Sequence, residues 1–173
     1  MQLHLCRLAS PVNLDVNASM SDCPTPSSAA PSPSSVNAWV RLMRAQRILL
    51  AAIEQDLKAA GLPPLGWYDV LLELARAADG RLRPYEIEDR ILLEQHNLSR
   101  LLDRMEKAGL VRREVFSEDG RGRWAVITED GRAMQKGIWA VYGQAIRTHV
   151  GEKLSDAEAV QLSDLLARLS TKV

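Results

Sequence analysis

The stretch at residues 98–131 constrains the fold of this chain more strongly than any other part. It opens with LSRLLDRMEKAG, in which apolar and charged residues alternate at helical spacing, so that one helix face is apolar and the other charged. The apolar face carries Leu98, Leu101, Leu102 and Met105. The sequence that follows, LVRREVFSEDGRGRWAVIT, contains two strand-like runs, at 111–116 and 123–127, on either side of a turn rich in glycine and arginine. The stretch therefore predicts an amphipathic helix over about 94–108 that leads directly into a β-hairpin.

Helical periodicity and end signals predict further helices on both sides of this unit. The predicted helices run from about residue 37 to 60, from 67 to 78, from 84 onward, from 129 to about 149 and from 156 onward. Pro84 suits a first helical position, and Thr128 and Ser155 are expected N-caps. The predicted fold class is mainly α with a small β-hairpin wing, a winged helix-turn-helix with flanking helices.

Residues 1–36 differ from the rest in composition. They are rich in Ser, Pro, Ala and Asn, with too few large apolar side chains to offset the entropy of ordering, so we predict a disordered tail. Met20 offers an alternative translation start within it. Both cysteines, Cys6 and Cys23, lie here without CxxC spacing or histidines at ligand spacing, which argues against a structural disulfide or zinc site. A redox role for Cys23 stays open.

Charge and motif content narrow the function classes. The chain has 22 basic and 22 acidic residues, so any attraction to a polyanion must come from local clustering. No apolar run approaches the roughly 20 residues that cross a bilayer, and the start lacks a secretory signal pattern, so we expect a cytoplasmic protein. The histidines His4, His96 and His149 are scattered, and no GxSxG, HExxH, Walker or dinucleotide motif is present. We expect no enzyme activity, no cofactor and no metal.

A short helix, a second helix and a hairpin in this order are what place a helix in the DNA major groove with the hairpin alongside. The expected contact residues of the recognition helix are Gln95, His96, Asn97, Ser99, Arg100 and Arg104. Arg100 suits guanine, whereas Gln95 or Asn97 suits adenine, and Asp103 is placed to orient Arg100 or Lys107. Two alternatives are an ordinary solvated helix face and a winged-helix protein-interaction module that does not bind DNA.

The hairpin tip has the residues for a minor-groove contact. Gly120 and Gly122 allow tight turns, while Arg121 and Arg123 project charge, and arginine is favoured in narrow minor grooves. Asp119 is close enough in sequence to hold the Arg121 guanidinium. On its own this turn is also compatible with a solvated loop that contacts nothing.

Over about residues 37–170 the chain resembles the MarR family of bacterial winged helix-turn-helix regulators. The matching pieces are LSRLLDRMEKAGLVRRE at 98–114, the wing pair Asp119 and Arg121, and the ITEDG run at 127–131 that closes the wing. The resemblance implies a homodimer that binds double-stranded DNA at an imperfect palindrome, in most such families as a repressor that an effector releases. Glu94 and Arg83 depart from the family pattern, because a hydroxyl residue is common at both places.

The flanking helices predict dimerisation independently, since they are too apolar to pack only against a winged helix of about 65 residues. Trp39, Trp139 and Tyr142 are candidates for that shared core, with plain packing as the alternative role. By analogy with the family, the wall of a pocket for a small aromatic effector would include Trp39, Met43, Arg47, Trp67 and Tyr68. We thus divide the chain into the tail (1–36), a dimerisation helix (37–62), a DNA-binding winged helix-turn-helix (63–131) and carboxy-terminal dimerisation helices (132–173).

Overall fold

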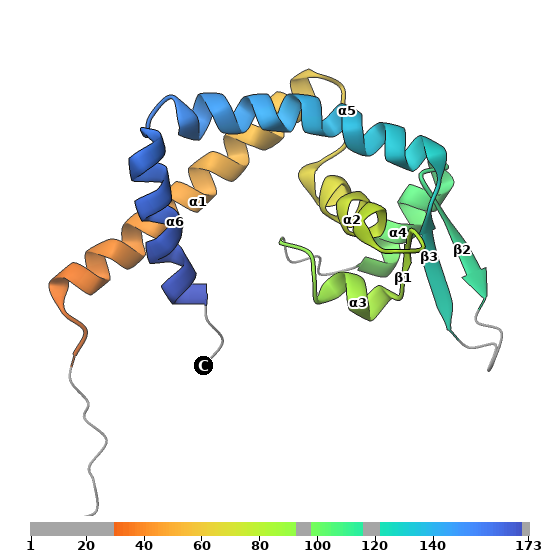
Figure 1. Cartoon of the computed structure of the whole chain (residues 1–173), viewed down its shortest axis with the longest axis horizontal. Coiled ribbons are helices and arrows are strands. Elements are labelled where there is room, and N and C mark those ends of the chain that lie inside the picture. The colour runs from red at the N-terminus through yellow and green to blue at the C-terminus, as the bar shows by residue number, and fades with distance from the viewer. Residues whose placement is uncertain (1–29, 93–97, 116–121, 171–173) are drawn as a thin grey trace, which may run out of the picture.

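The computed structural model describes residues 30–92, 98–115 and 122–170. Their elements in chain order are α1 (Pro33–Ala59), α2 (Leu65–Arg76), β1 (Arg81–Leu82), α3 (Pro84–Glu88), α4 (Leu98–Lys107), β2 (Val111–Val115), β3 (Arg123–Ile127), α5 (Glu129–Ile146), the π-helical turn η1 (Arg147–Gly151) and α6 (Asp156–Ser170). Helices α2 to α4 and the strands form one body, from which α1 and α5 extend together as an arm that carries α6 (Figure 1). The predicted class, mainly α with a small hairpin wing, is confirmed.

The sheet is antiparallel, in the order β1-β3-β2. The predicted hairpin is present, with Val111 opposite Ile127 and Val115 opposite Arg123. Strand β1 was not predicted, because two residues are too few to show an alternating pattern. It pairs with β3 only at the end nearest the body, where Leu82 faces Ala125. The distal part of the hairpin is therefore a two-stranded ribbon.

The core lies between α2, α4, the inner face of the sheet and the start of the arm. The apolar face predicted for α4 is confirmed, since its four apolar side chains are at most 2% exposed. Ile87 of α3 and Leu71 and Leu74 of α2 are completely buried against the same cluster, as is Ile138 of α5. This burial fixes the rotation of α4, and with it the face that α4 turns outward.

The helix ends follow local capping chemistry. We predicted order from residue 37, but α1 begins at Pro33, because the Ser32 hydroxyl accepts a hydrogen bond from the Ser35 N–H at 3.1 Å and Pro33 fits the first turn. Helix α2 begins at Leu65, after Pro64, rather than at Trp67. Thr128 caps α5 as predicted and accepts from the Gly131 N–H at 3.0 Å. Ser155 likewise precedes α6, where its hydroxyl accepts from the Glu158 N–H at 3.4 Å.

Helix α5 continues past Ile146 as the π-helical turn η1, which accounts for the predicted reach to about residue 149. Within η1, His149 lies 2.8 Å from Asp56 of α1, measured between Nε2 and Oδ2. This pair links the carboxy-terminal end of α1 to the turn that follows α5. No helix among the described residues is long and apolar enough to cross a membrane.

Candidate nucleic-acid interface

Helix α4 presents a polar face opposite its buried one. Ser99, Arg100 and Arg104, three of the six residues predicted to contact DNA from this helix, are exposed on it. The other three, Gln95, His96 and Asn97, lie outside the described residues. Short helix α3 precedes α4, and strand β2 follows it after Gly109, whose φ of +74° suits glycine. The arrangement is that of a recognition helix beside a wing.

The start of α3 has a cap of a different kind from the expected hydroxyl. At Arg83, the backbone N–H donates to the Glu86 carboxylate at 2.7 Å. Only this half of a capping box forms, because a guanidinium has no acceptor atom to offer in return. The departure at Arg83 therefore leaves the helix start satisfied. The second departure, at Glu94, lies outside the described residues.

A cluster of charged side chains joins α4 to the wing. Nη2 of Arg113 in β2 donates to Oδ1 of Asp103 at 2.6 Å and to the Ser99 carbonyl oxygen at 3.3 Å. Nε of the same arginine lies 3.6 Å from Oε2 of Glu106. Asp103 thus forms an ion pair with Arg113 that was not predicted from the sequence, and its role in orienting Arg100 or Lys107 stays a prediction. Strand alternation was the available signal, since Arg113 shares its face with the buried Val111.

The wing has an exposed arginine at the base of its tip. Arg123 is exposed at the start of β3, whereas Asp119 and Arg121 lie outside the described residues. On the outer face of the sheet, Cζ of Arg81 and Cζ of Arg83 each lie 5.1 Å from the centroid of the Trp124 ring. Cation–π contacts of this length hold the guanidinium groups over the ring. This basic cluster was not predicted from the sequence.

The ITEDG run is where the wing joins the arm. The Thr128 hydroxyl donates to the Gly109 carbonyl oxygen at 2.7 Å, and the Thr128 N–H donates to the Leu110 carbonyl oxygen at 3.1 Å. Gly131 is buried against the same Leu110 carbonyl, where a Cβ atom would collide. This run therefore fixes the start of α5 against the end of α4.

The predicted effector residues fall in two places. Trp39 and Met43 belong to the first half of α1, which lies beside α6 and away from α2 (Figure 1), and they are 62% and 38% exposed. Arg47 is exposed further along α1. Trp67 and Tyr68 belong to α2, where Trp67 is half-buried and Tyr68 is buried. The single chain does not bring the two groups together.

Tyr68 lies in an aromatic cluster at the junction of α2 and α5. Its ring stacks on Trp139 with centroids 6.0 Å apart and meets Tyr142 edge-on at 5.3 Å. Burial raises the pKa of Tyr68 and that of Tyr142, and the nearby Asp69 carboxylate raises both further. Trp139 is 50% exposed, so one side of the cluster is open.

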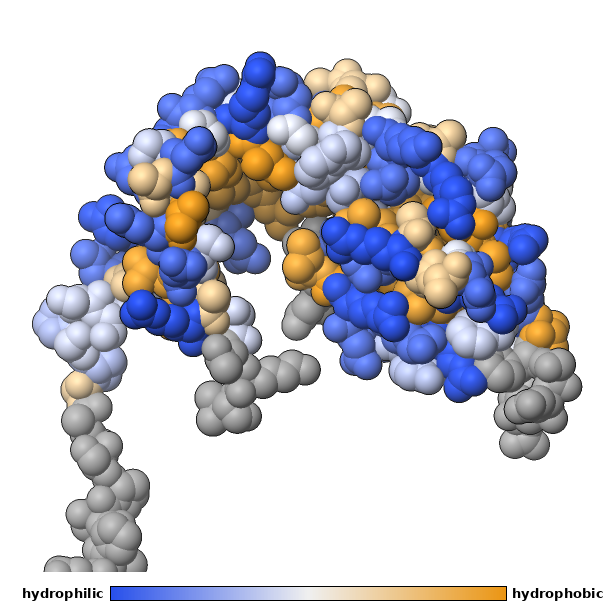
Figure 2. Space-filling model, viewed as in Figure 1, coloured by the Kyte–Doolittle hydropathy of each residue, from blue (hydrophilic) through white to orange (hydrophobic). Residues whose placement is uncertain are grey.

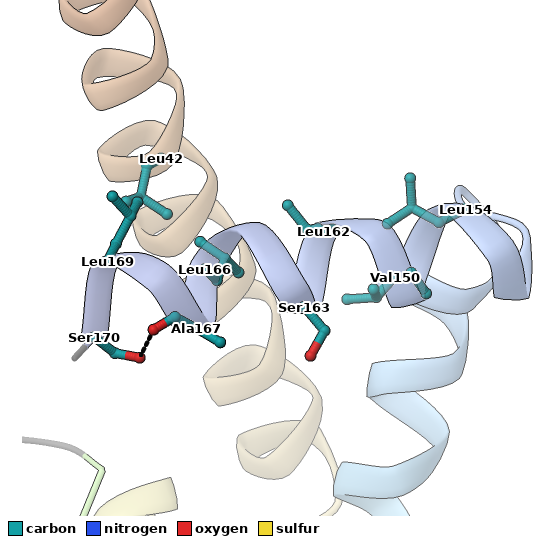
Figure 3. Close-up of a pocket in the computed structure, with 10 residues that line it drawn as sticks. Leu42, Val150, Leu154, Leu162, Ser163, Leu166, Ala167, Leu169 and Ser170 are labelled. Atoms are coloured by element: carbon teal, nitrogen blue, oxygen red, sulfur yellow. Dashed lines mark hydrogen bonds between the residues drawn. The ribbon is translucent and has the colours of Figure 1, made fainter.

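An apolar groove of about 650 Å³ lies between α6 and the first half of α1 (Figure 3). Leu42 of α1 and Leu162, Leu166 and Leu169 of α6 line it. Further apolar residues are visible on the concave side of the arm, where they meet solvent in the single chain (Figure 2). None of the five predicted effector residues lines this groove.

Comparisons with known proteins agree with this geometry. A sequence profile of the MarR family matches residues 60–122. AbsC, a MarR family transcriptional regulator from Streptomyces coelicolor, is 26% identical, with a TM-score of 0.71 over 83% of this chain and 96% of its own. Sco3205, a regulator of the same family and organism solved in complex with DNA, is 25% identical, with a TM-score of 0.72 over 82% of this chain and 89% of its own.

A third structure, BpsR from Bordetella bronchiseptica, is 21% identical and has a TM-score of 0.70 over 83% of this chain and all of its own. DNA binding by BpsR is regulated by 6-hydroxynicotinic acid. At this identity the likeness concerns the fold. Together with the exposed polar face of α4 and the wing beside it, these comparisons show that the chain is similar to the MarR family of transcriptional regulators, in sequence over residues 60–122 and in fold over most of its length.

Proposed function

We propose that this protein is a homodimeric repressor that binds an imperfect palindrome of double-stranded DNA and is released from it by a small aromatic effector. The observation that most directly supports DNA binding is the orientation of α4. Its apolar face is fully buried, so the side chains of Ser99, Arg100 and Arg104 are directed away from the core beside the wing. A helix held in this way suits the major groove, while Arg123 and the wing tip suit the adjacent minor groove.

The apolar arm supports the homodimer. Five large apolar residues of α6, namely Val160, Leu162, Leu165, Leu166 and Leu169, are 36–72% exposed in the single chain. Exposed apolar surface of this extent marks an association site, and a second copy of the same arm is the occupant that a two-fold DNA site calls for. Two winged helices would then meet half-sites one helical turn apart, about 34–36 Å.

The effector proposal rests on the aromatic residues of the arm and of α2. A pocket that includes both Trp39 and Tyr68 requires a second chain or a rearranged arm, because the first half of α1 lies away from α2 in the single chain (Figure 1). Such a ligand acts only through its different affinities for the DNA-competent and DNA-incompetent spacings of the two winged helices. Among similar structures, one has 2,4-dichlorophenol bound, which supports an aromatic ligand of modest size.

The test is fluorescence anisotropy on the DNA upstream of the protein's own gene at two salt concentrations. We expect tight binding whose logarithm falls with the logarithm of salt by about 0.9 per phosphate contacted. Arg100→Ala should weaken binding because Arg100 is exposed on α4. Arg121→Ala should also weaken it, a prediction that rests on the sequence because Arg121 lies outside the described residues. Lys136→Ala is the matched control, since it removes the same charge from an exposed site on α5.

Salt-insensitive binding, or equal affinity in all variants, would favour the alternative of a protein-interaction module. A genome-wide selection of bound fragments would separate that case from a distant operator. A repressor that binds operator DNA works where the chromosome lies, so we place the protein in the cytoplasm. We propose no enzyme activity, because the MarR relatives named above are transcriptional regulators.

A further inference from the structure

A single arginine of the wing spans much of the recognition helix. Arg113 lies in β2, yet its guanidinium reaches the Ser99 carbonyl in the first turn of α4, the Asp103 carboxylate in the next and Glu106 one turn further. The backbone N–H of Arg113 also donates to Oε1 of Glu106 at 3.2 Å. The side chain is only 21% exposed. We propose that Arg113 is a positioning residue that locks α4 to the wing, so that both meet DNA in a fixed relative geometry, and that it does so without contacting DNA.

The position of Arg113 in the sheet explains why a link between the hairpin and α4 is needed there. Arg113 is opposite Ala125, which is the last residue of β3 that β1 also pairs, through Leu82. Beyond this point the hairpin has two strands, and two-stranded hairpins are marginally stable alone. Arg113 therefore ties the hairpin to α4 at the position where the third strand ends. The two-stranded part of the hairpin, Glu114–Val115 paired with Arg123–Trp124, continues from this point.

Electrostatics favours the same role. Asp103 and Glu106 are acidic residues on a helix that is proposed to meet phosphates, where free carboxylates would oppose binding. Both are engaged by Arg113, with ion-pair distances of 2.6 and 3.6 Å. The contacts of Arg113 to Asp103 are charge-assisted and partly shielded from solvent, which makes them stronger than exposed pairs. The acidic residues thereby serve to orient α4.

Arg112 provides a matched comparison. It is the neighbouring residue of the same strand, carries the same charge and points to the opposite face of the sheet. Its guanidinium lies 2.8 Å from the Glu114 carboxylate, its side chain is 58% exposed, and within the described residues it forms no hydrogen bond or ion pair with α4. Removing Arg112 therefore changes the charge of the wing equally and leaves the lock intact.

The inference rests on the proposed DNA binding, so the probe must first be obtained with the wild-type protein. A duplex enriched from a random-sequence library serves as the specific probe, and a scrambled duplex of the same composition as the non-specific one. Failure to enrich any duplex would count against the proposed function itself. With a probe in hand, anisotropy titrations over a salt series give affinity and salt slope for the wild type, Arg112→Ala, Arg113→Ala, Asp103→Ala and the Arg113→Ala/Asp103→Ala double variant.

We expect Arg113→Ala to weaken specific binding about tenfold, within the range seen for residues that act on a binding element without touching the ligand. The salt slope should stay as in the Arg112→Ala control, and non-specific affinity should match that control. Asp103→Ala should also weaken specific binding, although it removes a negative charge. The double variant should lose no more affinity for the specific duplex than the weaker-binding of the two single variants. Because Asp103 is half-exposed, this variant tests the lock even if Arg113→Ala fails to fold.

Three results would overturn the inference. Arg113→Ala binding that equals the Arg112→Ala control would show that the lock is not needed. A salt slope smaller by about 0.9 than in that control would make Arg113 a phosphate contact. Tighter specific binding by Asp103→Ala would mean that this carboxylate only repels DNA.

Discussion

Replacing Gly131 with alanine tests how closely α5 packs on the start of the wing. The added Cβ would collide with the Leu110 carbonyl oxygen and lie 2.9 Å from Cγ1 of Ile127. Neither neighbour moves easily, because the Leu110 carbonyl accepts the Thr128 N–H at 3.1 Å and Ile127 is buried in the sheet. Overpacking of this kind costs about 1–3 kcal/mol, and a contact with fixed backbone belongs at the upper end.

A second effect acts in the opposite direction. Alanine is favoured over glycine in a helix by about 1 kcal/mol, so the net loss expected for Gly131→Ala is about 2 kcal/mol of unfolding free energy. Gly137 of the same helix supplies the control, since nothing lies within 4 Å of the Cβ position there. Gly137→Ala should therefore stabilise the protein by roughly 0.5–1 kcal/mol.

Thermal unfolding followed by circular dichroism, at one protein concentration throughout, measures both changes. For a chain of this length the expected shifts are a midpoint lower by roughly 4–8 °C for Gly131→Ala and slightly higher for Gly137→Ala. Fixed concentration matters because dimerisation raises the midpoint by mass action. If both variants gained stability equally, the close approach of α5 to Leu110 would be wrong, and helix propensity alone would govern both sites.

Three further predictions follow from other contacts. Thr128→Val removes a hydroxyl that caps α5 and donates to Gly109, so chemical denaturation should show a loss of about 1–2 kcal/mol, and Thr128→Ser should restore most of it. Burial raises the pKa of Tyr68 and of Tyr142, so above pH 10 the unfolded chain holds fewer tyrosine protons than the folded one. Stability should then fall as pH rises through this range, with tyrosinate absorbance appearing late and together with unfolding; a smooth early titration of all tyrosines would contradict it. Leu166→Asp on the exposed face of α6 should convert dimer to monomer in sedimentation with little loss of helix signal, whereas an unchanged mass would place the interface elsewhere.

The sequence predicted those parts of the fold in which local pattern and tertiary packing agree. Helix α4 showed its buried face through apolar spacing, and the strands of the hairpin match the predicted ranges apart from Phe116, which lies outside the described residues. Strand β1 has no such pattern, since it exists only because the edge of β3 is available for pairing. The start of α1 at Pro33 was not predicted for a related reason. Ser32 and Pro33 belong to a composition typical of disorder, yet the same two residues form a sound helix start.

The site shows the same division at the level of side chains. Exposure of Ser99, Arg100 and Arg104 follows from the helix period once the buried face is known. The link from Arg113 to Asp103 joins two elements, and predicting it requires knowing which face of β2 meets α4. An arginine on the inward side of a strand calls for an acidic partner, and α4 offers two at suitable spacing. The alternation of β2 therefore indicated that Arg113 faces α4, whereas the glycine- and arginine-rich composition of the hairpin led us to predict contacts only at its tip.

The apolar pattern of α6 indicates burial that a single chain does not provide. Fully burying a leucine or valine side chain is worth about 1.5–3 kcal/mol, so five such residues left 36–72% exposed represent a substantial unrealised stabilisation. A helix whose leucines recur at this spacing without a partner would be an aggregation hazard, and pairing with a second copy removes it. The same pairing would determine whether Trp39 and Met43 come near the aromatic cluster around Tyr68. The geometry of the dimer would thus determine the effector site, and through the same arm it would also determine the positions of the two recognition helices.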